Sequence, residues 1–139
     1  MTERTSNVDD RLTTKILVAD DNSLVRQILQ TRLERDGFVV VTAKTGKETL
    51  LRARETKPHV ICLDLSMPEM TGWDAAAKLK SDATLCHTPI IAVTACALPG
   101  DRERAIAAGC DEYETKPIHF PSLLKKAHSL VSRHRRATP

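Results

Sequence analysis

Apolar runs suited to buried strands recur along this chain, and a polar or charged residue follows most of them. Taking a carboxylate out of water costs several kcal/mol, so a strand that ends on one usually brings it to a rim where cations or donors reach it. The runs and the side chains after them are Ile16–Ala19 with Asp20 and Asp21, Val60–Leu63 with Asp64, and Ile90–Val93 with Thr94. A short strand expected over 111–115, which is not apolar, likewise leads into Lys116. If these strands are parallel, the polar side chains lie at one edge of the sheet and form a site.

Segments with helical patterning separate the strand-like runs. With a further β-branched run at Phe38–Thr42, strands and helices alternate five times. This alternation predicts parallel strands linked by right-handed crossovers, and therefore a doubly wound α/β fold with helices on both faces of a five-stranded sheet. The expected helices lie between Asn22 or Ser23 and Gly37, from the capping-box pattern Thr45–Glu48 onward, over Trp73–Lys80, between Pro99 and Gly109, and from about Pro121 to Val131.

Length and composition bound the class of protein. At 139 residues the chain has room for one domain with a substantial core. Its 41% hydrophobic and 28% charged residues are typical of a soluble globular protein. We predict a flexible leader over 1–14, one domain over 15–132, and a solvated basic tail over 133–139.

The sequence gives no indication of membrane insertion, secretion or nucleic-acid binding. No apolar run approaches the roughly 18 residues of a membrane span, and Met1–Arg11 is too polar for a signal sequence. The net charge of +3 is small and does not point to nucleic acid. We therefore expect a cytoplasmic protein, with small, buried, reduced thiols rather than a zinc site at Cys62, Cys86, Cys96 and Cys110.

The predicted edge of carboxylates is suited to phosphate chemistry. Because like charges repel, three carboxylates on one rim are best held together by a hard divalent cation, and Mg²⁺ leaves positions free for a phosphoryl oxygen. Asp64 stands alone at its strand end and is the better candidate nucleophile, while Asp20 and Asp21 form a metal pair. Lys116 and Thr94 supply a charge and a hydroxyl to the phosphoryl oxygens. No glycine-rich nucleotide loop is present, so the phosphoryl donor must come from elsewhere.

Over about Lys15–Val131 the chain resembles the receiver domain of two-component response regulators. Each matching motif is weak alone, but together, in this order and spacing, they are highly specific. The motifs are Asp20-Asp21, Leu63-Asp64 with Met67-Pro68 and Gly72, Val93-Thr94-Ala95, and Tyr113-Glu114-Thr115-Lys116-Pro117-Ile118.

The resemblance implies a flavodoxin-like sheet in the order 2-1-3-4-5 and a phosphoacceptor at Asp64, loaded from a phosphohistidine on a sensor kinase or phosphotransfer protein. It implies that Asp21, Asp64 and the backbone carbonyl of Ser66 ligate Mg²⁺, with Asp20 acting largely through water. Ser66 and Cys96 occupy positions where the family tunes the lifetime of its phosphate, and neither residue predicts a long or a short one. The Lys116–Pro117 bond is often cis in receivers.

The resemblance also implies a switch formed by Thr94 and Tyr113. The face made by the helix before Gly109, the strand 111–115 and the final helix would then change shape and bind a downstream protein. Tyr113 can instead be a fixed, half-buried ring with no switching role. Trp73 either packs against the neighbouring helices or contacts a partner protein.

The segment Val93–Arg104 looks most like stand-alone receivers of the DivK type and the receivers of hybrid kinases. We expect a stand-alone response regulator that signals by protein binding or passes its phosphate on, and that catalyses only its own phosphorylation and dephosphorylation. One rival is a phosphorylation-independent scaffold with the same fold. Another is a Mg²⁺-dependent phosphatase, which would need a second acid where this chain has Ser66.

Overall fold

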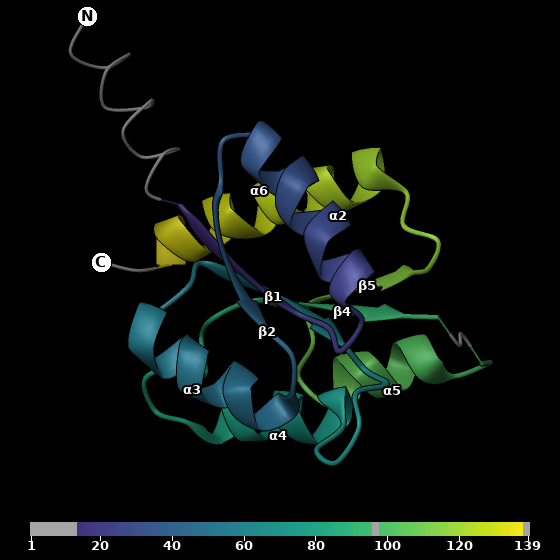
Figure 1. The fold of residues 1–139 in the computed structure, drawn as a ribbon. Coiled ribbons are helices and arrows are strands. Elements are labelled where there is room, and N and C mark those ends of the chain that lie inside the picture. Colours follow the sequence, from purple (N-terminus) through teal and green to yellow (C-terminus); the bar gives the residue numbers. More distant parts are fainter. Residues whose placement is uncertain (1–13, 96–97, 138–139) are drawn as a thin grey trace, which may run out of the picture.

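The computed structural model describes residues 14–95 and 98–137, and a parallel sheet runs through the middle of this part of the chain (Figure 1). Its strand order is β2-β1-β3-β4-β5, and every neighbouring pair is parallel. The predicted doubly wound α/β fold is therefore confirmed. The strands are β1 (Lys15–Ala19), β2 (Val39–Ala43), β3 (Val60–Asp64), β4 (Ile90–Thr94) and β5 (Glu112–Thr115).

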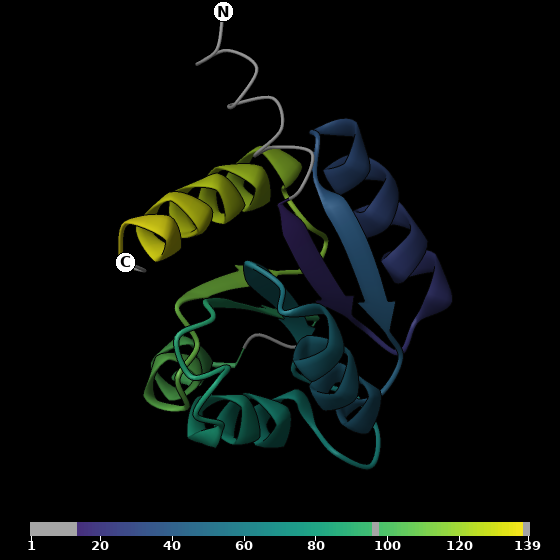
Figure 2. The same ribbon diagram turned by 90° about the vertical axis from the view of Figure 1, so that its left-hand side faces the viewer.

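Helices cover both faces of the sheet (Figure 2). On one face, α3, α4 and α5 pack over an apolar layer that includes Leu17, Ile61 and Leu79. On the other, α2 and α6 cover a layer that includes Ile91 and Leu123. β3 and β4 are buried along their whole length because both of their faces are covered, which is why they read as unbroken apolar runs. The helices are α2 (Ser23–Arg35), α3 (Gly46–Thr56), α4 (Gly72–Ser81), α5 (Asp101–Ala107) and α6 (Phe120–Ala137).

Side chains cap the helices that begin beside the carboxylate edge of the sheet. The Asn22 side chain accepts hydrogen bonds from the Leu24 and Val25 N–H groups, which makes Asn22 the N-cap of α2. Thr45 caps α3 by accepting from the Glu48 N–H. In return, the Glu48 carboxylate accepts from the Lys44 N–H, one residue before the position that a standard capping box uses.

Several predicted boundaries need correction. Strand β2 is shifted by one residue, because the Phe38 N–H bonds to the Leu33 carbonyl at the end of α2. Thr14, at the end of the predicted leader, is buried, and its carbonyl accepts from the Val39 N–H. The final helix runs on to Ala137, through most of the predicted basic tail, because neither glycine nor proline interrupts 122–137. Smaller shifts place the start of α4 at Gly72, its end at Ser81, and the start of β5 at Glu112.

The thiols in the described residues are free, as expected. Cys62 and Cys110 are buried, and burial raises the pKa of Cys62 to about 12 and of Cys110 to about 11. Both therefore remain protonated and unreactive at neutral pH. Cys86 is only partly buried, contrary to prediction, and Cys96 lies outside the described residues. Among the helices of the described residues, none combines the length and apolar character needed to cross a bilayer.

Candidate functional site

The carboxylates of Asp20, Asp21 and Asp64 meet at the carboxyl edge of the sheet. Asp20 directly follows β1 and Asp64 ends β3, and these strands are neighbours in the sheet. One carboxylate oxygen from each of the three residues lies within 4.8 Å of those of the other two. Asp20 and Asp64 are only 2% and 3% exposed, whereas Asp21 faces solvent. The topology therefore brings Asp64 of β3 together with the Asp20–Asp21 pair that follows β1.

Asp20 is held in place from several directions. One carboxylate oxygen accepts from the Asn22 N–H at 2.9 Å, and the other accepts from the Lys116 ammonium at 2.7 Å. Its backbone carbonyl accepts from the guanidinium of Arg26 in α2, also at 2.7 Å. Sequence patterning does not predict the contacts of Asn22 and Arg26 with Asp20. No local pattern distinguishes Arg26 from the other basic residues of α2.

Asp64 is buried but less closely paired. Its Oδ1 accepts from the Ser66 N–H at 3.0 Å, and its Oδ2 lies 3.7 Å from the Lys116 ammonium. Burial raises the pKa of Asp64 to about 6, and the charges of Asp20 and Asp21 push it the same way, against the opposing effects of the Ser66 N–H and Lys116. At neutral pH Asp64 is therefore charged, and its burial and acidic neighbours make that charged form unfavourable.

Lys116 reaches the acids from the end of β5. The backbone N–H of Lys116 donates to the Thr94 carbonyl at 2.8 Å, which ties the start of the β5–α6 connection to the end of β4. The Lys116–Pro117 bond is cis. Thr94 is buried at the end of β4, beside β3 and Asp64. Tyr113 is not part of the acidic cluster, because it packs, partly buried, against the apolar layer under α3, α4 and α5.

The loop after Asp64 is packed too closely for a larger residue at its end. A Cβ on Gly72 would lie 2.2 Å from the Asp64 carbonyl oxygen and 2.5 Å from the Leu65 Cα. The loop also contacts α3, where a Cβ on Gly46 would lie 2.7 Å from the Met70 carbonyl oxygen. These close approaches explain why glycine occupies both positions. The tight packing keeps the loop that carries Ser66 in place.

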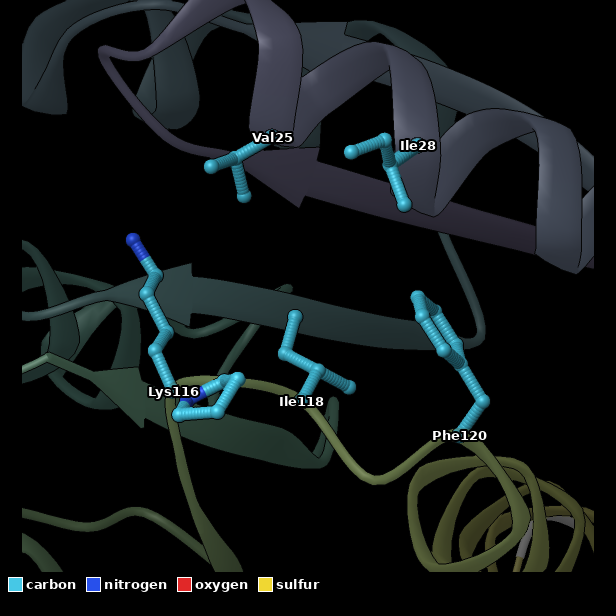
Figure 3. Close-up of a pocket in the computed structure, with 6 residues that line it drawn as sticks. Val25, Ile28, Lys116, Ile118 and Phe120 are labelled. Carbon is cyan, nitrogen blue, oxygen red and sulfur yellow. The ribbon is translucent and has the colours of Figure 1, made fainter.

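An apolar groove of about 280 Å³ begins at Lys116 and runs between α2 and the β5–α6 connection (Figure 3). Val25 and Ile28 of α2 line one side, and Ile118 and Phe120 face them from the other. Ile28 remains 45% exposed, and Leu24, one turn before it, is 63% exposed. The acidic site is therefore bordered by an apolar surface that solvent reaches.

The donor set at this edge fits a hard divalent cation. Three carboxylates within 4.8 Å of one another offer oxygen ligands of the kind that Mg²⁺ prefers, and together they carry more negative charge than Lys116 neutralises. The buried Asp64, a nearby ammonium and a cation site are the components that transfer of a phosphoryl group to a carboxylate requires.

Comparison with known proteins identifies the family. The model of the response regulator receiver domain matches residues 16–128. The chain is 36% identical over 120 residues to the polar-differentiation response regulator DivK of Brucella ovis, covering 86% of this chain and 98% of that protein.

Solved structures give the same result. The chemotaxis protein CheY4 of Vibrio cholerae has a TM-score of 0.79 at 30% identity, covering 84% of this chain and 98% of that one. A receiver domain protein from Clostridium thermocellum has a TM-score of 0.83 at 28% identity, covering 90% and 99%. The arrangement of the acidic edge and these matches lead to one conclusion: the chain belongs to the response regulator receiver domain family of two-component signalling.

Proposed function

We propose that this response regulator accepts a phosphoryl group on Asp64 from a phosphohistidine of a sensor histidine kinase or a histidine phosphotransfer protein. The observation that carries the proposal is a buried Asp64 whose carboxylate lies within 4.8 Å of those of Asp20 and Asp21 and 3.7 Å from Lys116. An aspartate oxygen attacks phosphorus, the phosphorus–nitrogen bond breaks, and the imidazole leaves with the electron pair.

The remaining residues of the site have distinct roles in this proposal. Asp21, Asp64 and the Ser66 backbone carbonyl hold Mg²⁺, and Asp20 contributes largely through water. When bound, the ion offsets the charge of the carboxylates and polarises the phosphoryl group. Lys116 pairs with a phosphoryl oxygen, and the Thr94 hydroxyl donates to another. Residues at the ends of separate strands thereby act on one group.

Phosphorylation then shifts an existing equilibrium between two conformations of the domain. In this proposal the Thr94 hydroxyl moves toward the phosphoryl group and Tyr113 turns inward. The face made by α5, β5 and α6 changes shape and binds a downstream protein, or the phosphate is passed on. Exposed apolar residues at this face support a binding role, since Ile106 on α5 is 45% exposed and Leu98 just before it is 61% exposed.

The apolar groove beside Lys116 supports the choice of a protein as phosphodonor. A donor that brings a phosphohistidine to Asp64 must rest on the surface around the site, and the groove between Val25, Ile28, Ile118 and Phe120 offers apolar area next to it. Burying that area would stabilise the complex by roughly 25 cal/mol per Å². We further propose that the protein acts in the cytoplasm, without binding nucleic acid or inserting into a membrane.

Intact-mass analysis tests the proposal. The protein is incubated with Mg²⁺ and either acetyl phosphate or a phosphorylated histidine phosphotransfer protein, beside an arm with EDTA. We expect the mass of one phosphoryl group to be added in the presence of Mg²⁺ only. The addition is expected to be absent in Asp64→Ala and retained in Asp74→Asn, which removes an exposed carboxylate from α4.

Failure of both donors to add mass to the unchanged protein would overturn the proposal. It would favour a scaffold that binds its partners without phosphorylation. Addition that persists in Asp64→Ala would show that another residue is the acceptor.

A further inference from the structure

Arg26 lies at the end of the first turn of α2 and reaches back to the loop that carries Asp20 and Asp21. Its guanidinium donates to the Asp20 backbone carbonyl at 2.7 Å, across six positions of sequence. Within the described residues, Arg26 forms no ion pair with Asp20, Asp21 or Asp64. A cation beside a cluster of acids is thus directed at a peptide group rather than at a carboxylate.

The position of that peptide group gives the contact its significance. The Asp20 carbonyl belongs to the peptide unit that joins Asp20 to Asp21. The carboxylate of Asp20 has its own partners, because it accepts from the Asn22 N–H and from Lys116. This peptide unit fixes where the Asp21 Cα lies. In the described part of the chain, no hydrogen bond or ion pair to the protein holds the exposed Asp21 carboxylate itself, so the backbone is what remains to place it.

We propose that Arg26 is a positioning residue for the cation site. By holding the Asp20–Asp21 peptide, it keeps the Asp21 carboxylate within 4.8 Å of those of Asp20 and Asp64. This inference rests on the proposed function in one respect, since it takes the three acids to bind Mg²⁺. In this role Arg26 touches neither the cation nor the phosphoryl group and acts through the backbone.

The charge of Arg26 and its positioning role predict opposite changes in Mg²⁺ affinity when Arg26 is removed. A positive side chain beside a cation site repels the cation, so electrostatics alone predicts tighter Mg²⁺ binding once the charge is gone. Loss of the hydrogen bond instead frees the peptide and spreads the Asp21 carboxylate over several positions, which weakens binding. Loss of a residue that orients a metal ligand typically costs about 10- to 100-fold in affinity. The sign of the change therefore distinguishes the two roles.

The experiment measures Mg²⁺ affinity of the full chain by titration calorimetry and stability by urea unfolding in metal-free buffer. Arg26→Met removes both charge and donor, Arg26→Lys keeps the charge and a donor, and Arg35→Met removes an exposed charge from the last turn of the same helix. We expect the dissociation constant to rise about tenfold in Arg26→Met and to stay within about threefold of the unchanged protein in Arg26→Lys. Arg35→Met is expected to leave it unchanged.

Each other outcome overturns the inference. Equal or tighter Mg²⁺ binding by Arg26→Met, with binding by the unchanged protein intact, would refute the positioning role alone. A loss of stability without a loss of affinity would assign Arg26 a purely structural role. If Arg26→Met does not fold, Arg26→Ala, which also removes both charge and donor, is titrated in its place: a rise of about tenfold in the dissociation constant is the supporting result, and unchanged affinity is the contrary one. No Mg²⁺ binding by the unchanged protein would overturn the proposed function together with this inference.

Discussion

Lys116 lies closer to Asp20 than to Asp64: its ammonium is 2.7 Å from a carboxylate oxygen of Asp20 and 3.7 Å from one of Asp64. In the metal-free protein the lysine thus mainly neutralises Asp20, and Asp64 keeps a raised pKa. Under the proposed mechanism, Lys116 must loosen its contact with Asp20 to reach a phosphoryl oxygen on Asp64. The same side chain then stabilises the site before and after phosphorylation.

Replacing Lys116 by methionine should raise the pKa of Asp64 above its value of about 6. The ammonium favours the charged form of Asp64, and its loss leaves the burial and the charges of Asp20 and Asp21 less opposed. Titration of the Asp64 carboxyl carbon by NMR measures this. Lys44→Met, which removes an exposed lysine just after β2, is the control and should leave the pKa in place. A lower pKa in Lys116→Met would contradict the electrostatic account.

Replacing Asp64 by asparagine should stabilise the protein in metal-free buffer above about pH 6. Because the folded state raises the pKa from 3.8 to about 6, it binds the Asp64 proton more tightly than the unfolded chain does. Stability is therefore lost as the pH rises from about 4 to about 6, and the cost is fully present above that range. The difference in pKa corresponds to on the order of 3 kcal/mol.

Urea unfolding at pH 7.5 and near pH 4 tests the pH dependence. The Asp64→Asn protein should be more stable than the unchanged protein at pH 7.5, and the gain should shrink toward pH 4, where both side chains are neutral. Glu69→Gln is the control, since it neutralises an exposed carboxylate on the same loop and should change stability by no more than about 0.5 kcal/mol at either pH. A gain that is independent of pH would show that the charge of Asp64 is not its cause.

Much of the fold is predictable because its determinants are local. The apolar runs at β1, β3 and β4 and the caps at Asn22 and Thr45 lie within a few residues of the elements they define. Parallel topology then brings Asp20, Asp64 and Thr94 to one edge without any detailed knowledge of packing. The boundaries that differ, such as Phe38 and the end of α6, depend on contacts or helix propensity that periodicity does not encode.

The remaining contacts of the site join residues that are distant in sequence or unmarked by any motif. Lys116 and Asp20 are 96 positions apart, and their contact depends on where the end of β5 lies relative to the end of β1, with β3 and β4 between these two strands. The same holds for Lys126 of α6, whose ammonium bonds to the Glu114 carboxylate at 2.7 Å and to the Tyr113 carbonyl at 2.9 Å. Such pairs follow from tertiary packing, so a single sequence does not specify them.

Replacing Gly72 by alanine should destabilise the protein by about 3 kcal/mol, because the added Cβ overlaps the Asp64 carbonyl oxygen and the Leu65 Cα, which belong to the backbone. Gly100→Ala is the matched comparison. At Gly100 the φ angle is +89° and nothing lies within 4 Å of an added Cβ, so only the backbone conformation opposes the change. We expect a cost of about 1 kcal/mol there. Urea unfolding measures both, and equal costs would contradict a steric role for Gly72.

The only tryptophan of the chain, Trp73, should report on the position of α5. The Arg104 guanidinium lies over its ring, 4.2 Å from the ring centre, and joins α5 to the start of α4. Trp73 also packs, partly buried, against the apolar layer, which assigns it to helix packing. Since Ala105 is the buried residue of α5, the Arg104 contact should contribute noticeably to holding this short helix.

Replacing Arg104 by methionine should lower the free energy of unfolding by about 0.5–1 kcal/mol, the usual contribution of a cation–π contact at an accessible site. It should also shift the Trp73 emission, because a neutral thioether chain replaces the planar cation over the ring. Arg102→Met removes another exposed cation from the same helix and is expected to leave the emission spectrum unchanged. If Arg104→Met and the unchanged protein have identical emission and stability, the contact does not hold α5, and the apolar layer under Ala105 alone anchors this helix.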